Sequence, residues 1–218
     1  MFMAKRIAST RGKHTLLGLS GAVALAGAVA VASLSGCGSS ASAQTPVFTV
    51  TSPDLASGTF DNKFLLNAFG CKGENVSPAV QWTNPPAGTK SFALQIIDTD
   101  APVFWHWAVY NIPGSATGLA QGAGNSAATL PAGAIPGTND FLDTGATGMN
   151  GNYGGPCPPA GDAPHHYTFR LYALGVDKLD EAGMVPKTGT PDLYNFVINI
   201  GVGPGLLGKA TFTATYGR

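Results

Sequence analysis

The chain has 218 residues, 12 of them Lys or Arg and 12 Asp or Glu, so its formal net charge is zero. Four of the basic residues lie within the first 13 positions, and the rest of the chain has 8 basic against 12 acidic residues, a net charge of −4. This balance excludes the basic surface that nucleic-acid-binding proteins need, so no nucleic-acid partner is expected. Val, Ile, Phe, Tyr and Trp are too frequent for a disordered chain.

The first 36 residues show the pattern of an export signal. A basic head over residues 1–13 is followed by an uncharged, apolar run over 16–34 and by the sequence LSGC at 34–37. A basic head, an apolar stretch and small residues before a cleavage site are typical of a secretory signal peptide. The LSGC sequence resembles the lipobox of bacterial lipoproteins, which implies that Cys37 is acylated and becomes the mature N-terminus.

The chain is therefore predicted to contain a signal peptide over 1–36, a flexible Ser- and Ala-rich tether over 37–46 and one folded domain over 47–218. An uncleaved transmembrane anchor is the alternative, because the apolar run approaches the ~20 residues that span a bilayer. Both interpretations place the domain outside the cytoplasm. The first attaches it to a bacterial membrane through a lipid, such as palmitate, on Cys37.

The folded part is predicted to be mainly β, an antiparallel β-sandwich with a few short helices. Apolar or alternating segments bounded by turn residues predict strands, and these lie at 47–51, 80–82, 91–98, 105–112, 166–174 and 211–216. Within the fifth of these segments, the period of two places four apolar side chains on one face: Tyr167, Phe169, Leu171 and Ala173.

The segments between the strands give weaker signals. Residues 114–165 are rich in Gly, Pro, Ala and Asn and are expected to form a long loop, which in a compact domain is usually functional or disordered. Residues 177–182 are compatible with a short turn of helix. Residues 191–199 begin with Pro, which favours the first turn of a helix, although the sequence FVI at 196–198 suits a strand as well.

Side chains that can take part in chemistry follow the predicted strands. Asp98 and Asp100 stand at the end of one strand, two positions apart. His106 lies between two Trp residues on the next strand, so alternation predicts the imidazole on one face and both indoles on the other. The rigid sequence YGGPCPP at 153–159 precedes His165, which leads into a further strand.

Each of these features alone has a plainer explanation. Paired Asp residues at a strand end are most often turn formers, and a single His on a strand is more often half-buried than a ligand. His and Asp side chains could also form a metal site. The sequence nevertheless contains no closely spaced metal motif such as HExxH or CxxC.

Together and in this order, the motifs resemble the phosphatidylethanolamine-binding protein family, and in particular its bacterial Raf-kinase-inhibitor-like branch. The resemblance rests on DTDAP at 98–102, the WHW strand that runs to 113, GPCPP at 155–159, HHYTFRLYAL at 165–174 and CKGENVSP at 71–78. It runs from about Phe48 to Arg218 and implies the β-sandwich of that family. The chain departs from the family pattern with Thr99 in place of Pro and His166 in place of Arg.

The resemblance also implies an anion-binding pocket. In that pocket two imidazoles donate hydrogen bonds to phosphate oxygens, while a carboxylate fixes the tautomer of one of them. The ligand-binding residues would be Asp98, Asp100, His106, Cys157, Pro158, Pro159, His165 and Tyr167.

Cys71 and Cys157 are the two cysteines that remain once Cys37 is acylated. In an oxidising compartment such an even pair predicts a disulfide. Two separate buried thiols are the alternative.

The sequence predicts a binding protein rather than an enzyme. No G-x-S-x-G elbow or other activated nucleophile is recognisable, and the resemblance implies a phosphate-type ligand or phosphorylated head group, with no cofactor and no metal. A role as inhibitor or modulator of another exported protein is compatible with the same pocket, and residues 114–165 would be its natural surface. The alternative is a hydrolase or metal-dependent enzyme in which His106 or His165 acts as the base.

Replacing Cys37 with Ala is expected to abolish lipid modification, because the cysteine of a lipobox is the residue that is acylated. Metabolic labelling with a fatty-acid analogue measures this, with the wild-type chain as the positive control. Label that persists in the Cys37→Ala chain, or that is absent from the wild type, would contradict the lipoprotein assignment.

Overall fold

The computed structural model describes residues 46–142, 151–181 and 185–218. The predicted signal peptide, Cys37 and all but the last residue of the predicted tether therefore lie outside the described residues. In the described part of the chain, no helix is both long and apolar enough to cross a membrane.

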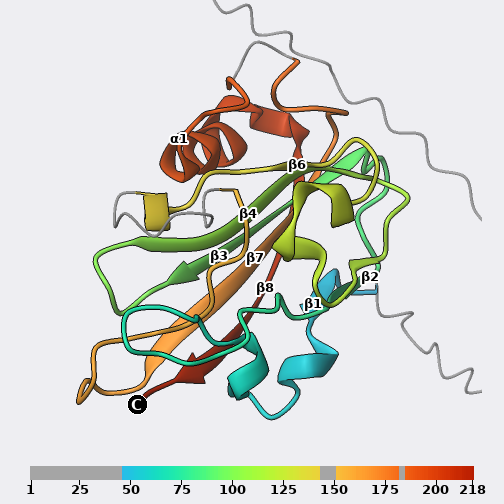
Figure 1. Ribbon diagram of the computed structural model, residues 1–218. Helices are drawn as coiled ribbons and strands as arrows, with labels where there is room; N and C mark the ends of the chain where they lie inside the picture. The colour runs from blue at the N-terminus through green and yellow to red at the C-terminus, as the bar shows by residue number, and fades with distance from the viewer. Residues whose placement is uncertain (1–45, 143–150, 182–184) are drawn as a thin grey trace, which may run out of the picture. The chain divides into compact units, whose positions relative to one another are not determined.

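Two antiparallel sheets form the fold (Figure 1). The larger has the strand order β6-β4-β3-β7-β8, with bounds Ile135–Pro136, Phe104–Pro113, Ser91–Asp98, His165–Leu174 and Leu206–Tyr216. The smaller has the order β1-β2-β5, with bounds Thr49–Thr51, Val80–Thr83 and Gly118–Leu119. The prediction of a mainly β, antiparallel fold is confirmed, and the strand predicted at 91–98 has the bounds of β3.

Helical structure consists of short segments. The helix α1 spans Pro191–Phe196 and continues into the π-helical turn η6, Val197–Gly201. Thr190 caps α1, because its side-chain oxygen accepts the backbone N–H of Leu193 at 3.3 Å. The prediction of a helix at 191–199 is thus confirmed, and the alternative of a strand at 196–198 is not. The 3-10 turns are η1 Pro53–Leu55, η2 Asn62–Phe64, η3 Ala123–Asn125, η4 Ala127–Thr129, η5 Asp140–Leu142 and η7 Gly203–Gly205.

The short helix suggested at 177–182 is not formed over 177–181, the part of that segment that the structure describes. There the backbone N–H of Leu179 donates to Oδ1 of Asn111 at 2.9 Å, and Nδ2 of Asn111 donates to Asp180 at 2.6 Å. Asn111 belongs to β4, so contacts with the sheet take the place of helical hydrogen bonds.

The segment 114–165 is less irregular than expected. It contains the short strands β5 and β6 and the turns η3, η4 and η5. Residues 143–150 of this segment lie outside the described residues.

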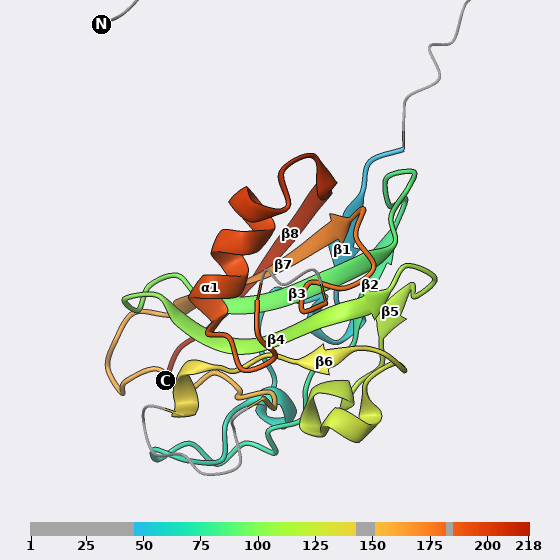
Figure 2. The same ribbon diagram turned by 90° about the horizontal axis from the view of Figure 1, so that it is seen from above.

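Two hydrophobic clusters cover the two faces of the larger sheet. The first lies between the sheets, where the rings of Trp82 of β2 and Phe92 of β3 are 5.1 Å apart. The second lies under α1 and η6, which cross the larger sheet in Figure 2, and there Tyr110 stacks on Tyr194 at 3.7 Å. The predicted alternation of β7 is confirmed, because the first cluster contains Tyr167, Phe169, Leu171 and Ala173.

Candidate functional site

A cavity of about 240 Å³ lies where β3 ends and where β4 and β7 begin. Four polar side chains line it, those of Asp98, His106, His165 and Tyr167. Of the residues predicted for the site, Asp100 alone is not in the lining. The other lining residues are Cys157, Pro158 and Pro159 of the loop before β7, with Leu66, Phe69, Ala101, Phe104 and Phe141.

Asp98 holds the end of β3 against the start of β7. This residue is only 4% exposed. Its Oδ1 accepts the backbone N–H groups of Asp100 and Ala101 at 2.9 and 3.2 Å, and its Oδ2 accepts the Nδ1–H of His165 at 2.7 Å. These bonds satisfy a buried carboxylate, which is strongly unfavourable when unpaired, and they fix the orientation of the imidazole.

The pKa of His165 is raised above its ordinary value of 6.5. Burial lowers this pKa, but the hydrogen bond and charge of Asp98, with the charges of Asp100 and Asp162, more than offset that effect. Because Nδ1 is engaged by Asp98, the protonated imidazole can offer Nε2–H to a ligand. The half-exposed carboxylate of Asp162 lies 3.7 Å from Nε2, which is an ion-pair distance and too long for a hydrogen bond. His165 is therefore a cationic donor at pH values below its raised pKa.

His106 has the opposite protonation behaviour. Burial lowers its pKa to about 4, although the Gly154 carbonyl and the charge of Asp98 act in the other direction. Its Nδ1 lies 2.8 Å from the Gly154 carbonyl oxygen, which can only accept, so Nδ1 has the proton and Nε2 keeps a lone pair. Near neutral pH His106 is thus an acceptor toward the cavity. This differs from the expectation that both imidazoles donate to an anion.

A β-bulge sets the orientation of His106. Ile96 pairs with Trp107 and Ile97 pairs with Trp105, so His106 is the extra residue on β4. Trp107 consequently belongs to the first hydrophobic cluster, while the indole N–H of Trp105 donates to a carboxylate of α1 on the other face at 3.1 Å. The prediction that both indoles share one face is wrong, because the alternation restarts at the bulge.

The hydroxyl of Tyr167 completes the polar part of the cavity. Tyr167 is 1% exposed, and in the described part of the chain its hydroxyl has no partner at hydrogen-bond distance, although the Asp98 carboxylate is near enough to interact with it. Burial, followed by the charge of Asp98, raises the pKa of this phenol, so it stays protonated. A buried hydroxyl without a partner is unfavourable, and here it lines a cavity in which a ligand could supply the partner.

Asp100 acts beside the cavity rather than in it. Its Oδ2 accepts the backbone N–H of His166 at 2.6 Å and lies 2.9 Å from Nδ1 of that residue, and these bonds lower the pKa of Asp100. Thr99 donates from its backbone N–H and its hydroxyl to the His166 carbonyl, at 3.0 and 3.1 Å. A Pro could make neither bond, so the Thr at this position fastens the turn after β3 to β7.

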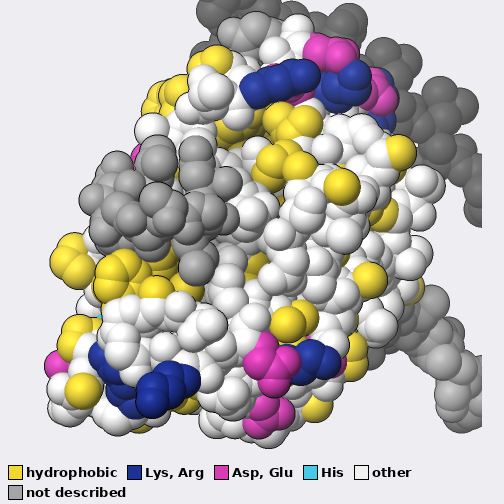
Figure 3. Space-filling view, viewed as in Figure 1, with side chains coloured by type: hydrophobic (Ala, Val, Ile, Leu, Met, Phe, Trp, Pro, Cys, Tyr) yellow, Lys and Arg dark blue, Asp and Glu magenta, His cyan; other side chains and the backbone are white. Residues whose placement is uncertain are grey.

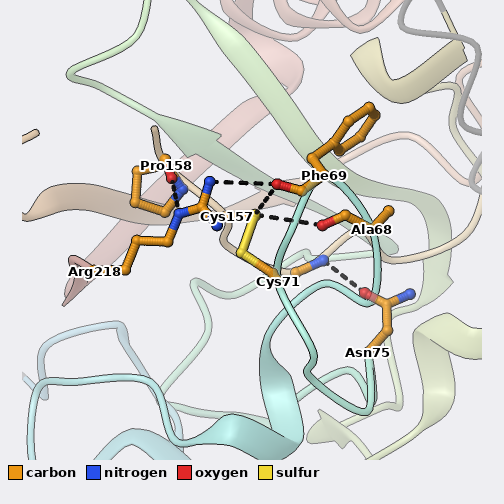
Figure 4. Close-up of a disulfide and its surroundings, with 8 residues drawn as sticks. Ala68, Phe69, Cys71, Asn75, Cys157, Pro158 and Arg218 are labelled. Carbon is orange, nitrogen blue, oxygen red and sulfur yellow. Dashed lines mark hydrogen bonds between the residues drawn. A yellow bond between two sulfur atoms is a disulfide. The ribbon is translucent and has the colours of Figure 1, made fainter. Parts of the chain in front are cut away.

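A disulfide fixes the loop before β7, which forms a further wall of the cavity (Figure 4). Cys157 is bonded to Cys71, with sulfur atoms 2.02 Å apart. The guanidinium of Arg218 bridges the same two segments, because Nε donates to the Pro158 carbonyl at 2.7 Å and Nη2 to the Phe69 carbonyl at 3.3 Å. A covalent link and a pair of hydrogen bonds thus hold this wall together.

Two asparagines join other loops to the site. Nδ2 of Asn75 donates to the Tyr153 carbonyl at 3.0 Å, and its Oδ1 accepts the backbone N–H of Gly155 at 2.8 Å. Nδ2 of Asn139 lies 3.4 Å from the carbonyl of His106. The loop before 143–150 is therefore bonded to β4, and the loop after it is bonded to the segment around Asn75 and, through the backbone N–H of Gly154, to the His106 carbonyl of β4 at 3.1 Å.

Several apolar lining residues were not predicted. Ala101 lies inside the DTDAP sequence and Phe104 directly precedes the WHW sequence, so both had a signal nearby. Leu66, Phe69 and Phe141 lie in segments without strand alternation. In the described residues, no three His, Cys, Asp or Glu side chains are placed to share a metal ion.

A family model, a related sequence and a solved structure all relate this chain to the same protein family. Residues 56–216 match the family described as phosphatidylethanolamine-binding protein. YbcL of Escherichia coli K12 is 45% identical over 163 residues, which cover 72% of this chain and 83% of that protein. Its crystal structure, described as that of a new member of the mammalian PEBP family, covers 78% of this chain and 98% of its own at 35% identity, with a TM-score of 0.67.

A relative from Mycobacterium tuberculosis is similar over nearly the same length. This protein, "Putative lipoprotein LppC", is 36% identical over 174 residues, which cover 71% of this chain and 79% of the relative.

Replacing Asp98 with Asn is expected to lower the pKa of His165, because the variant loses the charge and the hydrogen bond that raise it. NMR titration of the imidazole nitrogens measures both proteins, and in the wild type His165 should titrate above 6.5. Asp162→Asn is the matched control and should shift the pKa of His165 less, since the charge of Asp162 raises this pKa less than the charges of Asp98 and Asp100 do. An unchanged pKa in Asp98→Asn would rule out this electrostatic account.

Removing the disulfide is expected to lower the free energy of unfolding by roughly 4–5 kcal/mol, because the bond closes a long loop between cysteines 86 positions apart. Denaturant unfolding of a Cys71→Ser, Cys157→Ser double variant against the wild type measures this difference. Intact mass after alkylation without reductant is the control. Alkylation of both cysteines in the unreduced wild type would show that the bond is not formed.

Proposed function

The chain belongs to the phosphatidylethanolamine-binding protein family, and we propose that its cavity binds a small phosphate-type anion without converting it. The observation that supports the proposal is the difference between the two imidazoles. His165 offers a charged Nε2–H, the hydroxyl of Tyr167 lacks a partner, and His106 presents a lone pair. The site thus combines donors with one acceptor.

Singly protonated phosphate has the complementary set of groups. Its charged oxygens accept from His165 and Tyr167, and its P–OH group donates to Nε2 of His106. A phosphate monoester has the same groups at pH values below its second pKa, which is about 6. Sulfate has no proton to donate at these pH values, so it would leave the His106 nitrogen without a partner. The proposal therefore includes a preference for hydrogen phosphate over sulfate.

Hydrolysis is the weaker alternative for the same side chains. His106 has a free nitrogen and would be the candidate base, but a general base works best when its pKa is near the operating pH. A pKa of about 4 makes His106 a poor base at neutral pH. Its properties suit recognition of a proton on the ligand better than removal of a proton from water.

We further propose that the domain is exported and attached to a membrane through Cys37. The LSGC sequence at 34–37 supports this, and so does the similarity to a mycobacterial protein that is named as a lipoprotein. A binding domain held at a membrane surface would meet its ligand outside the cytoplasm.

Calorimetric titration of phosphate into the purified protein at pH 6 tests the binding proposal. His165→Ala and His106→Ala should each weaken binding by about 1.5–3 kcal/mol, as expected for the loss of a hydrogen bond to a charged group. Affinity should fall as the pH rises through the raised pKa of His165, because the deprotonated imidazole no longer attracts the anion. Sulfate should bind more weakly than phosphate.

His166→Ala is the matched control, since His166 is an exposed neighbour that does not line the cavity. Its affinity for phosphate should stay close to that of the wild type. Equal affinity in all four proteins, or no binding in any of them, would remove the pocket assignment and leave only the family and the fold.

A further inference from the structure

The lining of the cavity is more apolar than an inorganic anion requires. Beyond its four polar side chains, the walls consist of apolar groups that offer no hydrogen bond to a phosphate oxygen. The volume of about 240 Å³ approaches the ~300 Å³ at which sites for drug-sized ligands begin. An oxyanion at the polar end would leave the apolar part of this space for another portion of the ligand.

Two exposed apolar residues have an unusual backbone conformation. Phe69 is 53% exposed with φ 52°, and Val103 is 55% exposed with φ 41°. The left-handed region is unfavourable for bulky and β-branched side chains, and such strain is concentrated at ligand clamps and active sites. The other large apolar residues that are exposed in the described part of the chain have no positive φ: Val47, Leu193, Phe196 and Ile200.

Both residues belong to segments that bound the cavity. Phe69 lines it directly, and Val103 lies between Ala101 and Phe104, which also line it. Figure 3 shows hydrophobic side chains gathered at the left edge of the view, where Figure 1 places the turn between β3 and β4. The mouth of the cavity therefore has apolar side chains of its own, whereas single exposed apolar residues elsewhere need no special explanation.

The structure holds Phe69 in its strained conformation. The backbone N–H of Cys71 donates to the Ala68 carbonyl at 2.9 Å, which closes a tight turn around Phe69 and Gly70. Arg218 holds the Phe69 carbonyl, and the disulfide holds Cys71. Figure 4 shows the Phe69 ring directed away from both of these links, so the ring itself is left free for contact.

We propose that the ligand is a phosphate monoester with a planar, apolar substituent, which packs on Phe69 at the mouth of the cavity. This inference rests on the proposed function and names the class of ligand. The phosphate group occupies the polar end between His165, His106 and Tyr167, and the substituent contacts the apolar walls. Contact between the substituent and the Phe69 ring stabilises the complex beyond the burial of apolar area alone. This aromatic contribution corresponds to an increase in affinity of about 3- to 10-fold.

Titration with three soluble esters at pH 6 tests this: methyl phosphate, phenyl phosphate and hexyl phosphate. In the wild type, phenyl phosphate should bind about 3- to 10-fold more tightly than methyl phosphate. In Phe69→Asn this ratio should fall toward one, because Asn tolerates a positive φ and so keeps the turn while removing the ring. Val47→Asn, which changes an exposed apolar residue away from the cavity, should keep the wild-type ratio.

The outcomes separate this inference from the function on which it rests. Equal binding of methyl and phenyl phosphate in the wild type, or a preference that persists in Phe69→Asn, would overturn the inference and leave phosphate binding in place. Tighter binding of hexyl phosphate than of phenyl phosphate would overturn the planar substituent and indicate a lipid-like chain. Binding of none of the three esters would overturn the proposed function as well.

Discussion

The site depends on one buried carboxylate. Asp98 ends β3, and all of its hydrogen bonds go to groups that must be brought together for a cavity to exist. One oxygen closes the turn toward β4, and the other orients the first residue of β7. Because a buried carboxylate is tolerated only when its oxygens are satisfied, the turn, the sheet register and the imidazole orientation are linked through this side chain.

The same constraint explains why two imidazoles in one cavity behave differently. His165 and His106 are both buried, and burial lowers the pKa of each. His165 is bonded directly to Asp98, which reverses the effect, whereas His106 is bonded to a neutral carbonyl and surrounded by aromatic rings. Burial without a carboxylate partner gives a neutral acceptor, and burial with one gives a cationic donor. The pattern of donors and acceptors in the cavity follows from this difference.

Much of the fold and of the polar site could be predicted from the sequence. Strand β3 is an apolar segment bounded by turn residues, so its first and last residues could be predicted. The resemblance to a family predicted that four polar side chains share one pocket: Asp98, His106, His165 and Tyr167. Other features depend on tertiary structure. The bulge at His106 arises from strand pairing and moves Trp107 to the other face. The strained conformation of Phe69 leaves no periodic signal, because the contacts that hold it come from Arg218 and Cys157.

The protons of the two imidazoles can be observed directly in the complex with phosphate. We expect ¹H–¹⁵N spectra of the protein saturated with phosphate at pH 6 to show His165 protonated on both nitrogens and His106 protonated on Nδ1 alone. The resonances of both rings should move when phosphate is added. Two doubly protonated imidazoles, or rings that do not respond to phosphate, would contradict the account of one donor and one acceptor.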